Sequence, residues 1–476
     1  MNKLNNIEPQ RVFHYFEEIC AIPHGSGNMD KIAEYCVNFA KKHGLRYEHD
    51  EANNVIIYKD GTKAGKPVIL QGHIDMVCQK TPESNINFET DGLDICVEGD
   101  YISANGTTLG ADNGIAVAMI FAILESDALV HPLIEAVFTT DEEIGMIGAG
   151  KLDCTKLSGK RMINIDSESF DLLTVSCAGG SDCKILMPVK RTKACGKKVS
   201  ITLKGLKGGH SGVEIDKGRV NANVLAGRIL NYAKKLCDFD IISINGGDKG
   251  NAITPVCNME LVVNETEEFI SKIEDYFALV KKEISERERG VAISIRVEEE
   301  GNFDAIDKES KEKLIYVLLT APNGVVEMSA EIENLVETSL NLGVLRTEED
   351  KIVLHFALRS NKQTAMDFLE ERLTLLASYN GCDVEVSGHY PPWEYKENSA
   401  LQELYIKTYK EHFGKEPTVI AIHAGLECGM FASRIDDFDC ISIGPDMYEI
   451  HTVNERLSVS STKLIFELLV DILSKM

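Results

Sequence analysis

Residues 67–75 read PVILQGHID, and this stretch indicates the class of fold. Its apolar first half has the length of a short buried strand, and a histidine and an aspartate follow at its end. Further short apolar runs stand at 54–58, 134–139 and 162–165, and an apolar run of helix length stands at 114–124. Strands that alternate with helices predict an α/β layered domain, a mixed sheet flanked by helices.

The chain changes character twice outside this region. AGGSD at 178–182 and SGHYPPWEYKENS at 387–399 interrupt the pattern, and between them alternating strands and amphipathic helices predict an α+β domain with an antiparallel sheet. We therefore expect residues 1–181 and 387–476 to form one split domain, with residues 182–386 inserted into it.

Composition and charge exclude several classes of protein. The 476 residues are 44% hydrophobic and 26% charged, which are globular values and argue against disorder. Asp plus Glu number 75 against 50 Lys plus Arg, so the net charge of −25 argues against nucleic-acid binding and against anionic membranes. No apolar run approaches the ~18 residues that a membrane span needs.

Cysteine usage and the N-terminus favour a cytoplasmic protein. The 13 cysteines are an odd, scattered set without a Cys-x-x-Cys pair, as expected in a reducing compartment. The first 20 residues contain no apolar core of a secretory signal.

The histidine at the end of the opening stretch is the first candidate for metal chemistry. His73 and Asp75 are two residues apart on an extended chain, so their side chains point to the same side. His73 could bind a metal while Asp75 orients its ring or a nearby catalytic group. Because a lone histidine at a strand end is more often structural, this segment alone does not decide.

Two further segments place carboxylates beside apolar elements. Asp112 in LGADNG precedes the apolar helix, where it could cap the helix, and its lone pairs could also bridge two cations. Glu142 and Glu143 in TTDEEIG follow an apolar strand, and adjacent carboxylates repel unless a cation or solvent screens them. One glutamate could face a metal and the other a water; the alternative is a solvated acidic turn.

Asp166 in NIDSE and His451 in EIHT complete a set that argues for a site, since ligands bind at the carboxyl ends of strands in open α/β sheets. The set of two histidines and three carboxylates is His73, Asp112, Glu143, Asp166 and His451. If Asp112 is shared, each of two metals receives one histidine, one terminal carboxylate and the bridge, with a position left for water. These ligands suit Zn²⁺, with Mn²⁺ or Co²⁺ as substitutes.

The motifs together resemble those of the aminoacyl-histidine dipeptidases, the PepD-type cytosolic nonspecific dipeptidases of the di-zinc aminoacylase/carboxypeptidase-like metallopeptidase superfamily. The motifs occur in family order: GHIDMV, GTTLGADNGIAVAM, TTDEEIGMIGA, NIDSE, GGHSG and IHTVNERL. The resemblance runs from about residue 10 to 470. It implies a catalytic domain, the split one, and an inserted lid domain.

The resemblance also implies a role for each residue of the centre. His73 and Asp166 would hold one zinc, Glu143 and His451 the other, and Asp112 would bridge them. Family members often have a cis peptide after the bridging aspartate. Glu142 matches the general base that takes a proton from zinc-activated water, and Asp75 the residue behind His73.

Four further residues are similar to substrate-binding positions of the family: His210 in GGHSG, Asn251 in KGNAITP, Arg359 in ALRSN and Gly425 in HAGLECG. From sequence alone His210 could equally lie on a surface loop, and His423 and Glu427 could be local structure. Arginine suits a peptide carboxylate because its planar fork binds both oxygens.

The resemblance implies hydrolysis of dipeptides, Xaa-His and broader. The alternatives are a related tripeptidase, carboxypeptidase or N-acyl-amino-acid deacylase, or a metal-dependent binding protein without catalysis. The family's smaller lids borrow a residue from a partner subunit. The segment 182–386 is long enough for two small α+β units, so we expect one chain to supply the whole site. The sequence does not decide between a monomer and a homodimer.

Overall fold

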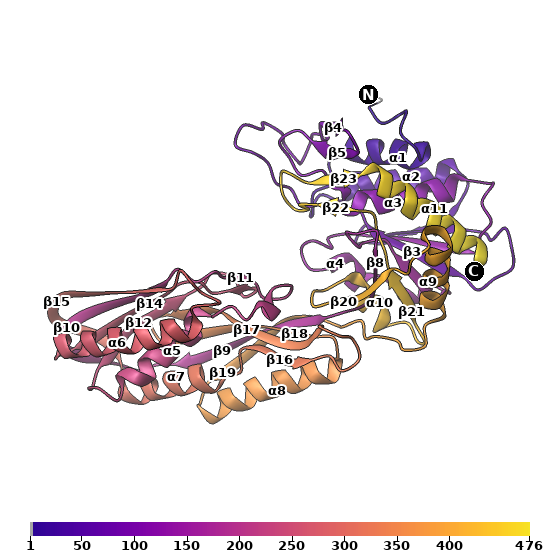
Figure 1. Cartoon of the computed structure of the whole chain (residues 1–476). Coiled ribbons are helices and arrows are strands. Elements are labelled where there is room, and N and C mark those ends of the chain that lie inside the picture. The colour runs from indigo at the N-terminus through magenta and orange to yellow at the C-terminus, as the bar shows by residue number, and fades with distance from the viewer. Residues whose placement is uncertain (1–2) are drawn as a thin grey trace. The chain divides into compact units, whose positions relative to one another are not determined.

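The structure is a computed structural model that describes residues 3–476, and these residues form two compact units (Figure 1). The first unit contains the chain up to Cys177, then Trp393–Ala421 and Leu426–Met476. The second unit contains Ala178–Pro392 and Ile422–Gly425. The second unit is thus inserted into the first.

The unit boundaries differ by a few residues from the expected 181/182 and 386/387. The Gly/Ser segment after Cys177 is not a linker, because β9 begins within it at Gly179. The last strand of the second unit, β19, extends to Tyr390. Residues 422–425 join the second unit because the Ala178 N–H lies 3.1 Å from the carbonyl oxygens of both Ile422 and Ala424.

The first unit is built on an eight-stranded mixed sheet in the order β1-β2-β6-β3-β7-β21-β8-β20. The strands are β1 (Arg46–His49), β2 (Val55–Lys59), β3 (Val68–His73), β6 (Ile134–Thr139), β7 (Arg161–Asn164), β8 (Leu172–Cys177), β20 (Thr418–Ile422) and β21 (Asp439–Ser442). The central strands β6, β3, β7 and β21 run parallel, so their carboxyl ends meet at one edge.

Helices complete the layers of the first unit. They are α1 (Gln10–Cys20), α2 (Asp30–Lys42), α3 (Ala111–Glu125), α4 (Ile147–Lys151), α9 (Ala400–Phe413), α10 (Glu427–Ala432) and α11 (Val459–Lys475). Every residue of α3 from Asn113 to Leu124 is buried, and α3 packs against β3. This burial explains why the helix is apolar on all its faces.

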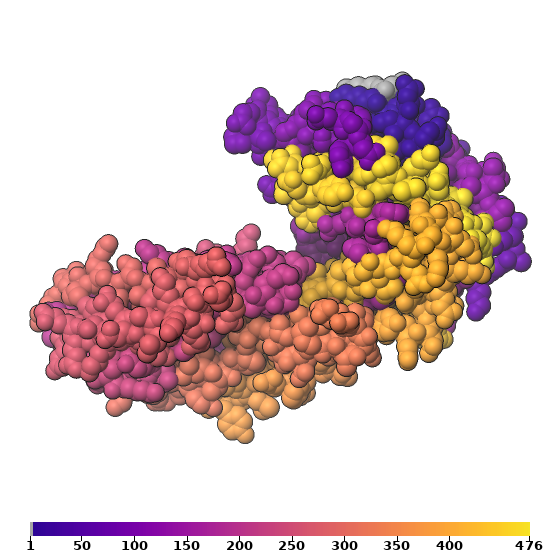
Figure 2. All heavy atoms as spheres, viewed as in Figure 1, coloured from indigo at the N-terminus to yellow at the C-terminus, as the bar shows by residue number. Residues whose placement is uncertain are grey.

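A small second sheet joins distant parts of the first unit. Its order is β22-β23-β5-β4, with β4 (Ile95–Glu98), β5 (Tyr101–Ala104), β22 (Met447–Tyr448) and β23 (Arg456–Ser458). In Figure 2 the yellow C-terminal segment lies packed against the indigo and purple N-terminal segments. The last part of the chain is therefore an integral part of the first unit.

The second unit is built on a nine-stranded antiparallel sheet. The order is β14-β10-β15-β12-β17-β18-β9-β19, and β16 pairs with β17. The strands are β9 (Gly179–Pro188), β10 (Arg191–Lys204), β12 (Asp240–Gly246), β14 (Cys257–Val263), β15 (Ala292–Ile306), β16 (Gly324–Met328), β17 (Val336–Thr347), β18 (Lys351–Ser360) and β19 (Asp383–Tyr390). A separate pair is formed by β11 (Gly209–His210) and β13 (Ala252–Ile253).

Four amphipathic helices share one apolar core with this sheet: α5 (Ala222–Ala233), α6 (Thr266–Ile284), α7 (Lys308–Thr320) and α8 (Gln363–Tyr379). All 13 cysteines of the chain are free thiols. Between residues 3 and 476, no helix combines the length and the apolar character that crossing a membrane requires.

Candidate active site

His73 is the last residue of β3 and is fully buried at the carboxyl edge of the sheet. Its Nδ1 lies 3.0 Å from the backbone oxygen of Asp75 and 3.3 Å from Asp75 Oδ1, so this nitrogen carries a proton. Its Nε2 lies 3.1 Å from Asp112 Oδ1 and 3.6 Å from Asp166 Oδ1. The ring therefore presents Nε2 to two carboxylates that come from other segments.

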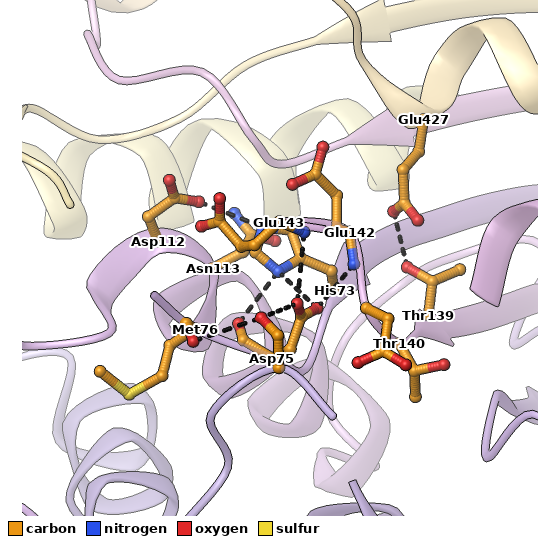
Figure 3. Close-up of polar contacts among 12 residues, drawn as sticks. His73, Asp75, Met76, Asp112, Asn113, Thr139, Thr140, Glu142, Glu143 and Glu427 are labelled. Atoms are coloured by element: carbon orange, nitrogen blue, oxygen red, sulfur yellow. Dashed lines mark hydrogen bonds and ion pairs between the residues drawn. The ribbon is translucent and has the colours of Figure 1, made fainter. Parts of the chain in front are cut away.

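Asp75 does more than orient the ring of His73. Its Oδ1 accepts a hydrogen bond of 3.0 Å from the backbone N–H of Glu142, and its Oδ2 accepts one of 3.3 Å from that of Glu143 (Figure 3). The Ser26 hydroxyl donates a further bond of 2.8 Å to Oδ2. Asp75 thus fixes the ring of one candidate ligand and the backbone of the two glutamates.

Asp112 does not cap its helix, because α3 has Gly110 at its N-cap without a side-chain cap. Its two oxygens instead face two histidines: Oδ1 lies 3.1 Å from His73 Nε2, and Oδ2 lies 3.1 Å from His451 Nε2. The Asp112–Asn113 peptide bond is cis, as the resemblance implies. This geometry fits a carboxylate that bridges two cations.

Two neighbouring residues explain how Asp112 reaches this position. A Cβ atom on Gly72 would lie 2.5 Å from Asn113 Oδ1, so the glycine of the GHID motif permits the close approach of α3 to β3. Asn113 Nδ2 also donates a 2.6 Å hydrogen bond to the carbonyl of Ile165. This bond ties the segment of Asp112 to the residue directly before Asp166.

Glu143 and His451 form the other half of the cluster. Glu143 Oε1 lies 2.9 Å from His451 Nε2, which also faces Asp112. His73, Asp112 and Glu143 each place one ligand atom within 4.8 Å of the other two. The five residues from the ends of β3, β6 and β7, the start of α3 and the C-terminal segment therefore converge.

The buried carboxylates and imidazoles of this cluster have shifted pKa values and favour the binding of a cation. Burial, together with the nearby carboxylates of Asp112 and Glu143, raises the pKa of Asp166 to about 6 despite the His73 ring beside it. Burial opposes the charge of His451 as well, but hydrogen bonds to Asp112 and Glu143 raise its pKa to about 10. Buried carboxylates gathered with imidazoles form the donor set of zinc sites, so these residues fit two divalent cations.

Glu142 lies beside the cluster without joining it. Its carboxylate makes no hydrogen bond or ion pair with any residue between 3 and 476, and Figure 3 shows it directed away from Asp75. Burial and then the charges of Asp166 and Glu427 raise its pKa well above the ordinary value, against the effect of His73. A half-buried carboxylate of raised pKa can take up and release a proton.

The sequence did not decide whether Glu427 has a structural or a functional role. The residue is fully buried in the first unit. Its Oε2 accepts a hydrogen bond of 2.6 Å from the Thr139 hydroxyl (Figure 3). It accepts a second bond of 2.6 Å from Gln71 Nε2, and the Gln71 side-chain oxygen in turn accepts one from Asn164. The bonds join β3, β6 and β7 beneath the cluster. Polar residues inside apolar strands, such as Gln71 and Asn164, are the sequence signal for this network.

The second unit holds the predicted lid residues, beginning with His210. The His210 Nδ1 accepts backbone N–H bonds from Gly212 at 3.1 Å and Val213 at 3.2 Å, so its proton is on Nε2. Burial and the guanidinium of Arg359 lower the pKa of His210, which keeps the ring neutral. The His210 backbone N–H donates to the Glu214 carboxylate, which also pairs with Arg219. These contacts hold the loop in place.

Asn251 and Arg359 line one cavity of about 300 Å³ in the second unit, together with Asp182, His355 and Tyr390. The Ser211 N–H donates to the Asn251 carbonyl at 2.9 Å, which binds the Asn251 segment to the His210 loop. Arg359 Nη1 donates to the Tyr390 hydroxyl oxygen at 3.0 Å. Three of the four predicted substrate-binding residues thus belong to one connected region.

Gly425 ends the short segment 422–425 that belongs to the second unit. Beside it, His423 is buried and its Nε2 lies 2.7 Å from the Ser339 hydroxyl. Its carbonyl oxygen would lie 2.7 Å from a Cβ on Gly212, so this segment packs against the His210 loop. The contacts of His423 therefore fit the structural role that the sequence allowed as one alternative.

Comparison with known proteins identifies the family. The model of peptidase family M20/M25/M40 matches residues 69–475. The chain belongs to this family. It is 35% identical to the cytosol non-specific dipeptidase of Escherichia coli over 483 residues, which cover 100% of this chain and 99% of the relative. Family membership makes the chain a peptidase and hence a hydrolase.

Solved structures agree with this assignment. The aminoacylhistidine dipeptidase of Vibrio alginolyticus superimposes with a TM-score of 0.93 at 34% identity, covering 99% of this chain and 98% of that one. The aminopeptidase PepT of Bacillus cereus, with a TM-score of 0.57 and 17% identity over 98% and 99% of the two chains, shares the fold. The predicted peptidase fold, with a mixed α/β domain, is confirmed.

Proposed function

We propose that this chain is a zinc-dependent dipeptidase that hydrolyses Xaa-His and other dipeptides. The observation that carries the proposal is the convergence of two histidines and three carboxylates beside one uncommitted glutamate, Glu142. The names of the two relatives that match over the full length support the substrate class. The first unit is the catalytic domain and the second unit the lid.

We assign two zinc ions to the cluster, with Co²⁺ or Mn²⁺ as substitutes. His73 and Asp166 would hold one ion, Glu143 and His451 would hold the other, and both ions would share Asp112. The distances between these side chains support this division, since His73 faces Asp166 and His451 faces Glu143. Bound zinc lowers the pKa of a water ligand and polarises a carbonyl oxygen.

Glu142 is the general base. It accepts a proton from the attacking water and later gives it to the leaving amine of the peptide, a transfer that suits a carboxylate of raised pKa. Asp75 supports both roles of the site, because it holds the ring of His73 and the backbone of Glu142.

The lid residues bind the two ends of the reacting peptide. His210 presents a neutral Nε2–H that donates to the oxygen that becomes negative during attack, with Asn251 beside it. Arg359 binds the C-terminal carboxylate of the substrate, which favours very short peptides. Gly425 contributes backbone contacts to the substrate.

The cellular setting follows from the same evidence. The relative of 35% identity is named a cytosol enzyme, and we place this chain in the cytoplasm with small peptides as its partners. We expect neither nucleic-acid nor membrane partners, because the net charge is −25. Either a monomer or a homodimer is compatible with this assignment.

The test combines zinc analysis with a substrate panel. Chelated chain, reloaded with zinc, is given Xaa-His dipeptides including β-Ala-His, other dipeptides, tripeptides and acetyl-amino acids. We expect about two zinc ions per chain and a clear preference for dipeptides. Preference for tripeptides or acetyl-amino acids would identify one of the related hydrolases instead, and zinc binding without any hydrolysis would identify a binding protein.

A further inference from the structure

Glu455 is a buried carboxylate that no step of the proposed reaction uses. It is only 2% exposed, and it accepts three consecutive backbone N–H groups: those of Leu109 at 2.8 Å, Gly110 at 3.2 Å and Ala111 at 2.8 Å. We propose that Glu455 is a positioning residue that fixes Asp112 relative to His451. The proposal rests on the proposed metal centre and adds a residue to it.

On one side the contact ends directly at the bridging carboxylate. Ala111, which donates to Glu455 Oε1, is the residue before Asp112. Gly110 has φ 66°, in the left-handed region that favours glycine, so the loop turns sharply just before α3. Hydrogen bonds to a charged acceptor are the stronger class, and three such bonds to one carboxylate hold this turn.

On the other side Glu455 is joined to His451 by a compact loop. The Thr452 N–H donates to the Glu449 carbonyl at 3.2 Å, and the Glu455 N–H donates to the Thr452 carbonyl at 3.2 Å. The Asn454 side chain donates to Glu449 Oε2 at 3.2 Å. Two successive turns therefore fix the position of Glu455 relative to His451.

The small sheet β22-β23-β5-β4 connects the segment that ends at Glu455 with the segment that leads to Leu109. β23 begins at Arg456, directly after Glu455, and pairs with β5, whose last residue lies a few positions before Leu109. Through its three hydrogen bonds, Glu455 links this sheet to the start of α3. His451 and Asp112, 339 residues apart in sequence, thereby share one framework.

The substitution that tests this role is Glu455→Gln. A glutamine side chain keeps the shape but has one acceptor oxygen, and its NH₂ group would face backbone donors. Removing a residue that orients metal ligands typically weakens metal affinity by about 10–100-fold. We expect zinc affinity, measured by competition of the full chain against a chromogenic chelator, to fall within this range.

Glu135→Gln is the matched control. Glu135 is also only 2% exposed and accepts the backbone N–H groups of Ser158 and Gly159, at the other end of the parallel strands. Both variants should lose stability to urea, but only Glu455→Gln should lose zinc affinity. Equal zinc affinity of the two variants would overturn the proposal.

A third variant and two further outcomes separate the possible failures. Glu455→Asp keeps the charge but shortens the reach, and it should bind zinc with intermediate affinity. If neither variant at 455 folds, Glu455 supports the fold as a whole and the specific role is refuted. If the wild type and Glu135→Gln bind no zinc, the proposed metal centre itself fails.

Discussion

Glu142 and Glu143, which follow β6, are both held by Asp75, but their side chains have different surroundings. Asp75 holds the backbone N–H groups of both Glu142 and Glu143, so the direction of each side chain is set. Glu143 points to His451, whereas the Glu142 carboxylate has no partner between residues 3 and 476. The local backbone thus supports the proposed division, in which Glu143 is a metal ligand and Glu142 is the base.

Glu142→Gln separates these tasks experimentally. The amide keeps the shape but cannot accept the proton, so we expect kcat to fall by about 10²–10⁴-fold while both zinc ions stay bound. Metal analysis and steady-state kinetics check this. Glu98→Gln, at an exposed position of β4, should leave both quantities unchanged. Activity within a few-fold of the wild type would refute the assignment of the base.

We expect His423 to make the stability of the second unit depend on pH. It is 6% exposed, and burial together with the Arg359 charge lowers its pKa to about 3, whereas the ordinary value is about 6.5. Between these values the unfolded chain binds a proton that the folded chain does not, so stability falls as the pH decreases.

The expected size of this effect follows from linkage. Between pH 7 and pH 5 the His423 contribution is about 2 kcal/mol of unfolding free energy. In urea unfolding at the two pH values, His423→Gln should lose about that much less stability than the wild type on acidification. His49→Gln removes an exposed imidazole and should behave like the wild type. Identical pH dependence of all three would contradict the prediction.

Much of the candidate site could be predicted at this scale. Each candidate carboxylate and His73 stands beside an apolar strand or helix, so the sheet edge brings them together. The partners of Asp75 could not be predicted, because a hydrogen bond from a distant backbone N–H leaves no trace in the sequence. The same holds for Glu455, whose contacts are 344 to 346 residues away.

At the scale of elements, the loop that carries His210 requires a glycine at position 212. A Cβ on Gly212 would lie 2.7 Å from the His423 carbonyl oxygen and 2.9 Å from His210 Cε1. The start of this loop is held by the pairing of β11 with β13, which limits how far the loop can move aside. The glycine is therefore required for space.

Gly212→Ala should disturb this loop. We expect a loss of about 1–3 kcal/mol in unfolding free energy from overpacking, and a larger loss in kcat/KM than in zinc affinity. Gly150→Ala is the control, since a Cβ there meets nothing within 4 Å. Urea unfolding, kinetics and chelator competition give the three readouts. Normal kinetics of Gly212→Ala would show that the loop adapts.

The elements themselves were predictable where periodicity is strong. The strand expected at 134–139 has these bounds as β6, and the apolar helix expected at 114–124 lies within α3 (Ala111–Glu125). The strand β9 was not expected, because its first residues are Gly-Gly-Ser and resemble a linker. The pattern does not show that neighbouring strands β18 and β19 stabilise this segment by hydrogen bonds.

At the scale of the whole molecule, the second unit is built on a single main sheet of nine strands, all from one chain. His210, Asn251 and Arg359 all belong to it, and each chain also carries a full set of candidate ligands. The prediction that one chain suffices for activity belongs to this scale.

Mixing variants tests that prediction. Arg359→Ala and His210→Ala, each inactive or strongly impaired alone, should remain so after mixing, denaturation and joint refolding. Activity assays against dipeptides provide the measurement, and a mixture of each variant with wild type controls for refolding yield. Recovery in the mixed sample would show that subunits exchange residues of the site.

The order of the five candidate ligands along the chain has a consequence for biosynthesis. Four of them precede the inserted unit, and the fifth, His451, follows it near the C-terminus. A ribosome therefore synthesises the whole inserted unit before it adds His451. A nascent chain that stops before His451 would lack one of the five proposed ligands, so we expect no peptide hydrolysis until synthesis has passed this residue.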